Sequence, residues 1–314
     1  MKLKVVFMGT PDFAVPTLKH LLQETEVVAV YTQPDKPVGR GLQMQPSPVK
    51  KVALEAGVPV FTPEKVSLSE EVEKLKSYEA DFFVIVAYGQ ILKLSVIETP
   101  KFGCINIHSS LLPRWRGAAP IHCALLAGDE ETGITTMKIA PKLDAGDMLM
   151  QAKTKITDND TAESLHDRLS VMGADLIMPT LNGMVDGTVK PVVQDESKVT
   201  YAHKLTKEME AISPMKSVRE IDLQVRGLNP WPGTRIETTA GLKIKIKTGK
   251  PSEKKNVGKT GELVVQGNAL LLQCADGAFE ITALQEEGKK AVPTSDFLNG
   301  IKNRNIPFPQ EVKT

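Results

Sequence analysis

The chain has 314 residues, more than one ordinary domain needs, with a net charge of +1, 41% hydrophobic and 25% charged residues. This composition is typical of a globular protein, and no apolar run approaches the roughly 18 residues that a membrane span requires. Three scattered cysteines give neither a disulfide framework nor a CxxC metal site. They favour a reducing compartment, and we expect the protein in the cytoplasm.

The N-terminal part alternates strand-like and helix-like segments. Residues 2–9 (KLKVVFMG) form an apolar run, and residues 11–23 then show helical spacing of apolar side chains. The pattern repeats, with further strands expected at residues 26–33, 58–61, 81–89 and 104–110. This alternation predicts an α/β fold with a Rossmann-like, doubly wound, mostly parallel sheet. The first turn, GTPDFA, is not GxGxxG, which disfavours a nicotinamide oxidoreductase.

Three loops are the candidates for carrying function. They follow the strand-like residues 81–89, 104–110 and 134–140. Ligands of open parallel sheets bind beyond the carboxyl ends of the strands, so we expect side chains of these three loops to form the site.

The pattern changes after a long helical stretch at residues 161–187. Short strand-like runs separated by glycine-containing turns then predict a small antiparallel barrel, similar to an OB fold. We therefore expect a catalytic domain at 1–189, a linker at 190–204 and a β-barrel domain at 205–314.

Basic residues are concentrated in the C-terminal part. Residues 1–204 hold 22 basic and 25 acidic side chains, and residues 205–314 hold 17 and 13. Residues 243–259 alone carry seven lysines against one glutamate. Such a cluster can attract phosphates, although lysines that only protect an edge strand are an equally good interpretation of the charge by itself.

Asn106 and His108 alternate with two isoleucines in the strand-like segment CINIH. On a strand their side chains project from one face and can act on one group. An amide and an imidazole can donate hydrogen bonds to an oxygen that becomes negative, and the imidazole can exchange protons near neutral pH. A hydrogen-bonded structural histidine is the alternative interpretation.

Asp144 precedes Ala145 and Gly146 in a tight turn between two strand-like runs. It could simply cap that turn. A carboxylate facing Asn106 and His108 would instead orient a water molecule or accept a proton.

Together these residues resemble the signature of the tetrahydrofolate-dependent formyltransferases. The matching residues are Asn106, His108, the Ser110-Leu111-Leu112-Pro113 segment, Arg116-Gly117 and the Leu143-Asp144-Ala145-Gly146 turn. The likeness extends over essentially the whole chain and is looser in the C-terminal part. The segments FMGTPDFA, QPDKPVGRG and RWRGAAPI are most similar to the family members that act on an aminoacylated tRNA.

The resemblance implies a reaction. A formyl group would pass from 10-formyltetrahydrofolate to the α-amino group of methionine esterified to initiator tRNA, giving N-formylmethionyl-tRNA for translation initiation. By the family's pattern, Asn106 and His108 would stabilise the developing oxyanion, and Asp144 would orient His108 and help to relay the amine's proton. We expect no metal and a monomer.

The resemblance also implies binding residues. Ser110, Leu111, Leu112 and Pro113 match the folate-binding segment, and Tyr88 and Gly89 lie in a strand exit that is either structural or in contact with the folate.

Residues 33–48 resemble an insertion loop that enters the acceptor stem, with Arg40 between two glycines and Lys36 nearby. Further tRNA contacts are expected from Arg114, which follows the folate segment, and from Lys243, Lys245 and Lys247.

Two alternatives to this function stay open from the sequence. One is a folate-linked formyltransferase or hydrolase with a small-molecule substrate, which would share Asn106, His108 and Asp144. The other is an RNA-binding module whose Rossmann-like part has lost activity.

Overall fold

The computed structural model describes residues 2–38, 43–302, 304 and 306–313. The chain forms two compact units. The first comprises residues 1–120, 131–155 and 166–202, and the second comprises residues 121–130, 156–165 and 203–314. Within the described residues, no helix has both the length and the apolar character to cross a bilayer.

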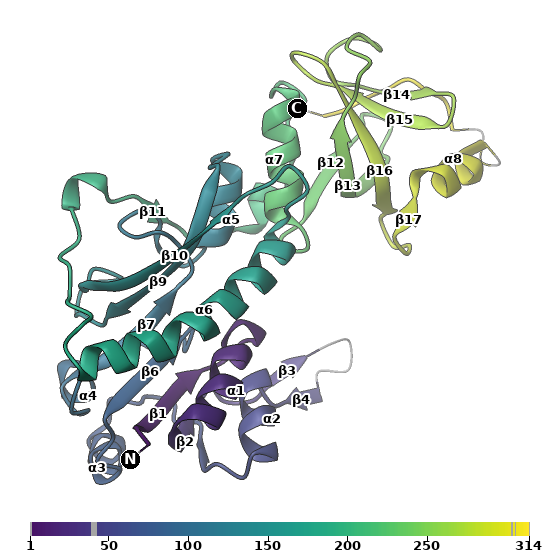
Figure 1. Ribbon diagram of the computed structural model, residues 1–314. Helices are drawn as coiled ribbons and strands as arrows, with labels where there is room; N and C mark the ends of the chain where they lie inside the picture. Colours follow the sequence, from purple (N-terminus) through teal and green to yellow (C-terminus); the bar gives the residue numbers. More distant parts are fainter. Residues whose placement is uncertain (1, 39–42, 303, 305, 314) are drawn as a thin grey trace. The chain divides into compact units, whose positions relative to one another are not determined.

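The first unit is built on a seven-stranded sheet in the order β10-β9-β7-β6-β1-β2-β5 (Figure 1). The strands are β1 (Lys4–Gly9), β2 (Glu26–Tyr31), β5 (Val60–Phe61), β6 (Phe82–Val86), β7 (Cys104–His108), β9 (Glu131–Lys138) and β10 (Met148–Lys155). The strands from β5 to β7 are parallel, whereas β9 and β10 each run antiparallel to their neighbours. The prediction of a mostly parallel, doubly wound sheet is confirmed.

Helices lie over both faces of this sheet because the parallel strands are apolar on both sides. They are α1 (Val15–Glu24) after the short 3-10 helix η1 (Asp12–Ala14), α2 (Pro48–Glu55), α3 (Ser69–Ser77), α4 (Leu94–Ile97) and α6 (Ala162–Val185), which belongs to this unit from His166 onward. On one face, Val72 and Leu75 of α3 and Val96 of α4 share a core with buried strand residues. On the other face, α6 lies close to β7 because Gly173 has no side chain. An added Cβ at Gly173 would press against Ile107 of β7.

Two small pairings complete the first unit. Strands β3 (Lys36–Val38) and β4 (Gln43–Gln45) pair antiparallel. The two-residue strands β8 (Arg116–Gly117) and β11 (Tyr201–Ala202) pair parallel. The second pairing places residues near 200, which the sequence predicts to lie in a linker, directly against the segment after β7.

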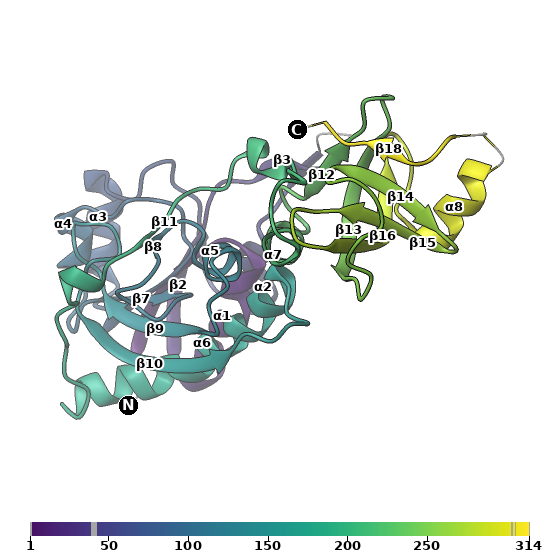
Figure 2. The same ribbon diagram turned by 90° about the horizontal axis from the view of Figure 1, so that it is seen from above.

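The second unit is a curled antiparallel sheet (Figure 2). Its strands are β12 (Thr234–Glu237), β13 (Lys243–Pro251), β14 (Glu262–Gln266), β15 (Ala269–Gln273), β16 (Ala278–Glu286), β17 (Val292–Pro293) and β18 (Gln310–Glu311). An antiparallel bridge between Thr238 and Val312 joins the ends of β12 and β18, the two edge strands. The sheet therefore curls far enough for its edges to meet, which confirms the predicted barrel-like domain.

Helices pack against this curled sheet. The second unit contains α5 (Pro120–Leu126) from Ile121 onward, α7 (Val218–Leu228), α8 (Thr294–Lys302) and the 3-10 helix η3 (Lys207–Glu210). Ile221 and Val225 of α7 pack in the same core as Phe297 and Leu298 of α8. Ser217 begins α7 with a capping box, so the first turn of this helix is hydrogen-bonded at its exposed end.

Candidate active site

Backbone strain marks the three loops that the sequence singles out. Only four non-glycine residues of the described chain have a positive φ, and three of them lie in these loops: Ala87 after β6 (48°), Trp115 after β7 (64°) and Asp144 after β9 (47°). Non-glycine residues in this region of φ and ψ are held there by surrounding contacts, and such residues cluster at functional sites.

The third loop reaches the site by a different route from the one that the sequence predicts. Because β9 runs antiparallel to β7, Lys138 at its end pairs with Ile105 at the beginning of β7. The loop therefore leaves the opposite edge of the sheet from the loops after β6 and β7. The chain then turns back at Gly146, where a Cβ would overlap the carbonyl oxygen of Lys138. The expectation of one shared strand edge is wrong, although the loop still brings Asp144 to His108.

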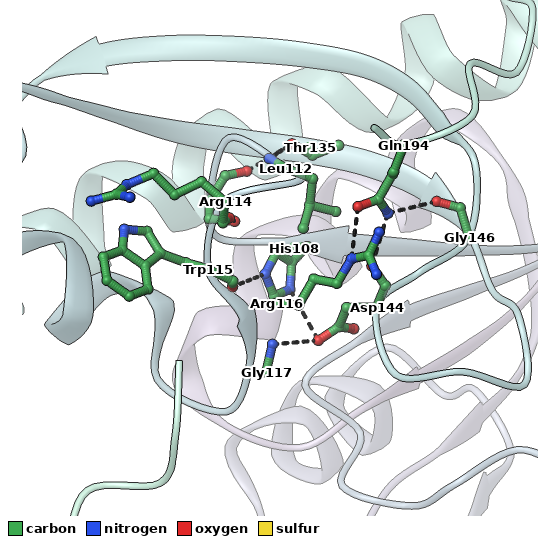
Figure 3. Close-up of polar contacts among 11 residues, drawn as sticks. His108, Leu112, Arg114, Trp115, Arg116, Gly117, Thr135, Asp144, Gly146 and Gln194 are labelled. Carbon is green, nitrogen blue, oxygen red and sulfur yellow. Dashed lines mark hydrogen bonds and ion pairs between the residues drawn. The ribbon is translucent and has the colours of Figure 1, made fainter. Parts of the chain in front are cut away.

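His108 is buried between two of these loops (Figure 3). Its Nε2 lies 2.9 Å from the carbonyl oxygen of Trp115, and its Nδ1 lies 3.8 Å from Oδ2 of Asp144. A carbonyl oxygen can only accept, so Nε2 carries a proton and donates. In the neutral ring Nδ1 then has a lone pair, and it is the one nitrogen left to take up or give a proton.

Asp144 does not act as the cap of its own turn. Its Oδ2 accepts a hydrogen bond from the backbone N–H of Gly117, 27 residues earlier, at 2.9 Å. Its side chain is 14% exposed, so the carboxylate is largely shielded from water. The carboxylate thus joins the loop after β9 to the loop after β7, beside His108.

Gln194 forms hydrogen bonds with the backbone of the turn that carries Asp144 (Figure 3). Gln194 Nε2 donates to the carbonyl oxygens of Asp144 and Gly146, both at 2.8 Å. Gln194 Oε1 accepts from Nε of Arg116 at 2.9 Å, and Arg116 Nη2 donates to Glu196 at 2.8 Å. These hydrogen bonds hold the pKa of Glu196 below its ordinary value, with the Arg116 bond as the largest cause and a bond from Lys142 as the second.

Asn106 lies near the middle of β7, beside Ile85 of β6 and Met137 of β9. Strand alternation puts its side chain on the same face as that of His108, and the side chain is half-buried. Among the described residues, its amide group has no hydrogen-bond partner. The amide is available to a ligand at this face of the strand.

The predicted folate segment is fastened to the neighbouring strands. Thr135 of β9 donates to the carbonyl oxygen of Ser110 at 2.7 Å and accepts from the N–H of Leu112 at 3.1 Å. Gln151 of β10 donates to the carbonyl oxygen of Leu112 at 2.9 Å. Ser110 and Leu112 are buried, whereas Leu111 and Pro113 are half-buried. Direct contact between this segment and the folate therefore stays a prediction. Leu111 and Pro113 are the residues of the segment that are exposed enough to make it.

Tyr88 and Gly89 lie at the carboxyl edge of the parallel strands. The carbonyl oxygen of Tyr88 accepts from Oγ1 of Thr10, after β1, at 3.0 Å and from Nε2 of Gln33, after β2, at 3.2 Å. Gly89 has a φ of 85°. The phenol of Tyr88 is buried, which raises its pKa. These bonds fix the backbone at the strand exit, and contact with a ligand stays a prediction.

The predicted tRNA contacts lie in several places. Arg40 lies outside the described residues. Lys36 is exposed on β3, and the exposed Arg114 has its guanidinium 4.3 Å from the centre of the Trp115 ring.

In the second unit, β13 alternates buried isoleucines with Lys243, Lys245 and Lys247, which share the outward side and are called here the lysine face.

Sequence reasoning missed the residues that hold the site together. Gln194 and Glu196 fall in the predicted linker, and Thr135 and Gln151 lie in strands without a motif. Each acts on a residue between 16 and 80 positions away, so local spacing gives no signal for them. Within the described residues, no group of three or more His, Cys, Asp or Glu side chains could hold a metal ion.

Two family models match the chain. The formyl transferase model covers residues 1–181, and the model of the formyl transferase C-terminal domain covers residues 204–302.

Curated relatives match at nearly full length. The chain is 45% identical to the methionyl-tRNA formyltransferase of Methylococcus capsulatus over 298 residues, covering 95% of this chain and 96% of the relative. It is also 45% identical to the methionyl-tRNA formyltransferase of a Listeria monocytogenes strain over 304 residues, covering 96% and 97%.

Solved structures share the fold at lower identity. The sugar 3N-formyltransferase WlaRD, crystallised with dTDP and 5-N-formyl-THF, matches with a TM-score of 0.67 at 20% identity, over 92% of this chain and 100% of that one. HypX of Aquifex aeolicus in complex with tetrahydrofolic acid matches with a TM-score of 0.64 at 14% identity, over 100% and 51%.

Proposed function

The chain belongs to the formyl transferase family, and we propose that it formylates methionyl initiator tRNA. It is an enzyme that transfers the formyl group of 10-formyltetrahydrofolate to the α-amino group of methionine on the tRNA. The product, N-formylmethionyl-tRNA, serves translation initiation. The observation that carries this function is 45% identity over almost the whole chain, the second unit included, to relatives that bear this activity in their names.

The described residues fit a folate co-substrate. Ile91, in the loop after β6, is 89% exposed, and Leu143, next to Asp144, is 63% exposed. Exposed apolar side chains on these two loops can pack against the face of a flat ring such as the pterin. When bound, 10-formyltetrahydrofolate supplies the formyl carbon as an electrophile.

Asn106 and His108 act on the oxygen of the formyl group. The free amide of Asn106 donates to this oxygen as the amine attacks and negative charge grows on it. His108 has only Nδ1 for chemistry because Trp115 occupies Nε2. In the neutral ring Nδ1 accepts the proton that the amine must lose, and the charged ring donates from the same atom to the oxygen.

Asp144 lies beside the nitrogen of His108 that exchanges the proton. Its carboxylate faces Nδ1 at 3.8 Å, within the range where a charge pair stabilises a protonated ring but beyond a hydrogen bond. The N–H of Gly117 fixes one carboxylate oxygen. Asp144 thus lies where it can help to relay the amine's proton to N10 of tetrahydrofolate, which leaves as the bond between N10 and the formyl carbon breaks.

The tRNA meets both units in this proposal. The lysine face presents three cations on one side of β13, suited to a phosphate backbone. Arg114 and Trp115 follow the folate segment, so they can contact the 3′ end of the acceptor stem by charge and stacking. We further propose that the protein acts as a monomer and works in the cytoplasm, where its tRNA substrate is used.

Transfer of labelled formyl tests the function directly. The full chain is mixed with labelled 10-formyltetrahydrofolate and, in parallel, with methionyl initiator tRNA, methionyl elongator tRNA, free methionine or water. Selective label on the initiator tRNA is expected. Labelled formate without labelled tRNA would identify a hydrolase, and folate binding without any transfer would identify an inactive RNA-binding protein.

A further inference from the structure

The segment that follows α6 lies against the candidate active site. Thr200 accepts from the N–H of Trp115 through its hydroxyl and from the N–H of Arg116 through its carbonyl oxygen, both at 2.9 Å. Val192 pairs with Met148, the first residue of β10. Residues between these two anchors are thereby held beside the turn that contains Asp144.

Gln194 is the residue of this segment that touches the turn. It is 4% exposed, and its amide nitrogen uses both of its hydrogens on the carbonyl oxygens of Asp144 and Gly146. The first carbonyl directly follows the left-handed backbone of Asp144, which has a φ of 47°, and the second lies two residues further along the turn. One side chain thus fixes the backbone that leaves Asp144.

Arg116 determines which way the amide of Gln194 points. Its Nε donates to Oε1 of Gln194, which leaves the NH2 group of Gln194 facing the turn. Arg116 itself is fully buried, and Glu196 accepts from its Nη2. A rotated amide would turn its oxygen toward the two carbonyl oxygens and its NH2 group toward the guanidinium N–H, so the guanidinium and the turn favour the same orientation.

We propose that Gln194 is a positioning residue for formyl transfer. It holds the Asp144 turn so that the carboxylate faces Nδ1 of His108, and Arg116 keeps its amide in the orientation that this requires. Partners that orient a catalytic group without touching substrate typically change activity by about 10-fold to 100-fold when they are altered. The inference rests on the proposed function, since it assigns Asp144 a part in the transfer.

The chain contains a matched control for this residue. Gln224 of α7 is 5% exposed, accepts from Nζ of Lys216, and donates its amide hydrogens to the carbonyl oxygens of Met209 and Ala211 at 2.9 and 3.0 Å. It reproduces the chemistry of Gln194 within the second unit. A comparison of the two separates positioning of Asp144 from a general loss of stability.

The test measures kcat and KM for both substrates in Gln194→Glu and Gln224→Glu, on full-length protein with the folded fraction checked by thermal unfolding. Glutamate retains an acceptor for the neighbouring cation and removes both donors. We expect kcat of Gln194→Glu to fall about 10-fold to 100-fold with KM nearly unchanged. Gln224→Glu should lower the unfolding midpoint and leave kcat near the wild-type value. If Gln194→Glu fails to fold, Gln194→Met, which adds no charge, takes its place.

A double variant identifies the residue through which Gln194 acts. If it acts through Asp144, then Asp144→Asn with Gln194→Glu should be no slower than Asp144→Asn alone, because the two changes remove one effect. Three results would each overturn the proposal. They are an unchanged kcat in Gln194→Glu, a loss of kcat in Gln224→Glu as large as in Gln194→Glu, and a loss of kcat in the double variant that is the sum of the two single effects. Wild-type protein without formyl transfer would instead refute the proposed function.

Discussion

The Asp144 turn and the lysine face differ in how many contacts hold their functional groups. Asp144 is fixed by the N–H of Gly117 at its side chain and by Gln194 at its backbone. On the lysine face, Lys243 has Glu287 at 3.3 Å, while Lys245 and Lys247 have no ion pair among the described residues. The function of Asp144 depends on one fixed geometry of its turn, whereas the function of the lysine face depends on its positive charge. Substitutions should therefore act steeply at the turn and gradually on the lysine face.

The largest effect is expected from Asp144→Asn. The amide keeps the size of the side chain but removes the negative charge beside His108, so the proton route is lost. We expect kcat to fall about 10²-fold to 10⁴-fold, the range for general acid–base catalysis. Single-turnover transfer to methionyl-tRNA measures this, with folate binding as the control for an intact site. Near-normal turnover in a folded variant that binds folate would exclude the proposed route.

Asn106→Ala should be the next most severe change. It removes the donor that we assign to the formyl oxygen, and loss of one such donor typically lowers kcat about 10²-fold to 10³-fold. The rate at saturating concentrations of both substrates is the quantity to compare. A variant that is defective only in KM would show that Asn106 binds substrate without stabilising charge.

Gly146→Ala tests the backbone of the turn. A Cβ here would overlap the carbonyl oxygen of Lys138, so the turn must shift, and we expect a loss of about 1–3 kcal/mol in the free energy of unfolding. Urea unfolding measures it. Gly300→Ala in α8 is the matched control, because nothing lies within 4 Å of its added Cβ. Equal stability in both variants would contradict the close approach at Gly146.

Replacement of Lys243, Lys245 and Lys247 by glutamine should weaken tRNA binding about 10-fold at physiological salt and leave kcat unchanged. Each lost phosphate contact should lower the slope of log affinity against log salt by about one. The exposed Lys153 and Lys155 of β10, changed in the same way, are the control. An unchanged slope in the triple variant would remove the lysine face from the tRNA-binding surface.

The smallest effect is expected from Glu196→Gln, and it depends on pH. The pKa of Glu196 is lower in the folded protein because Arg116 and Lys142 bind its carboxylate. Its contribution to stability is therefore present above the ordinary pKa of 4.5 and is lost as the pH falls through the lower folded value. The variant should unfold at a lower temperature than the wild type at pH 7, and the difference should shrink in acid. A difference that persists at pH 3 would have another cause.

Residues that repeat with a regular period were predictable from the sequence. The parallel strands follow from apolar runs such as residues 81–89, and the lysine face follows from alternation with isoleucines on β13. The motifs also predicted that Asp144 faces His108, and the structure places Nδ1 of His108 3.8 Å from Oδ2 of Asp144. The catalytic roles of these two residues and of Asn106 stay predictions.

Contacts between distant segments could not be predicted in this way. The reversal of β9 was missed because a buried strand has the same pattern in either direction. Gln194 was missed because its partners lie 48 to 78 residues away and its own segment has no hydrophobic period.

The most direct test measures rate and affinity together in two variants, Asp144→Asn and the triple glutamine variant of the lysine face. Single-turnover formyl transfer at saturating methionyl-tRNA gives the rate, and titration of the tRNA gives Kd. Our account predicts that Asp144→Asn loses rate with an unchanged Kd, and that the lysine variant loses affinity with an unchanged rate. If each variant lost both rate and affinity, chemistry and tRNA binding would not be divided between these two sites.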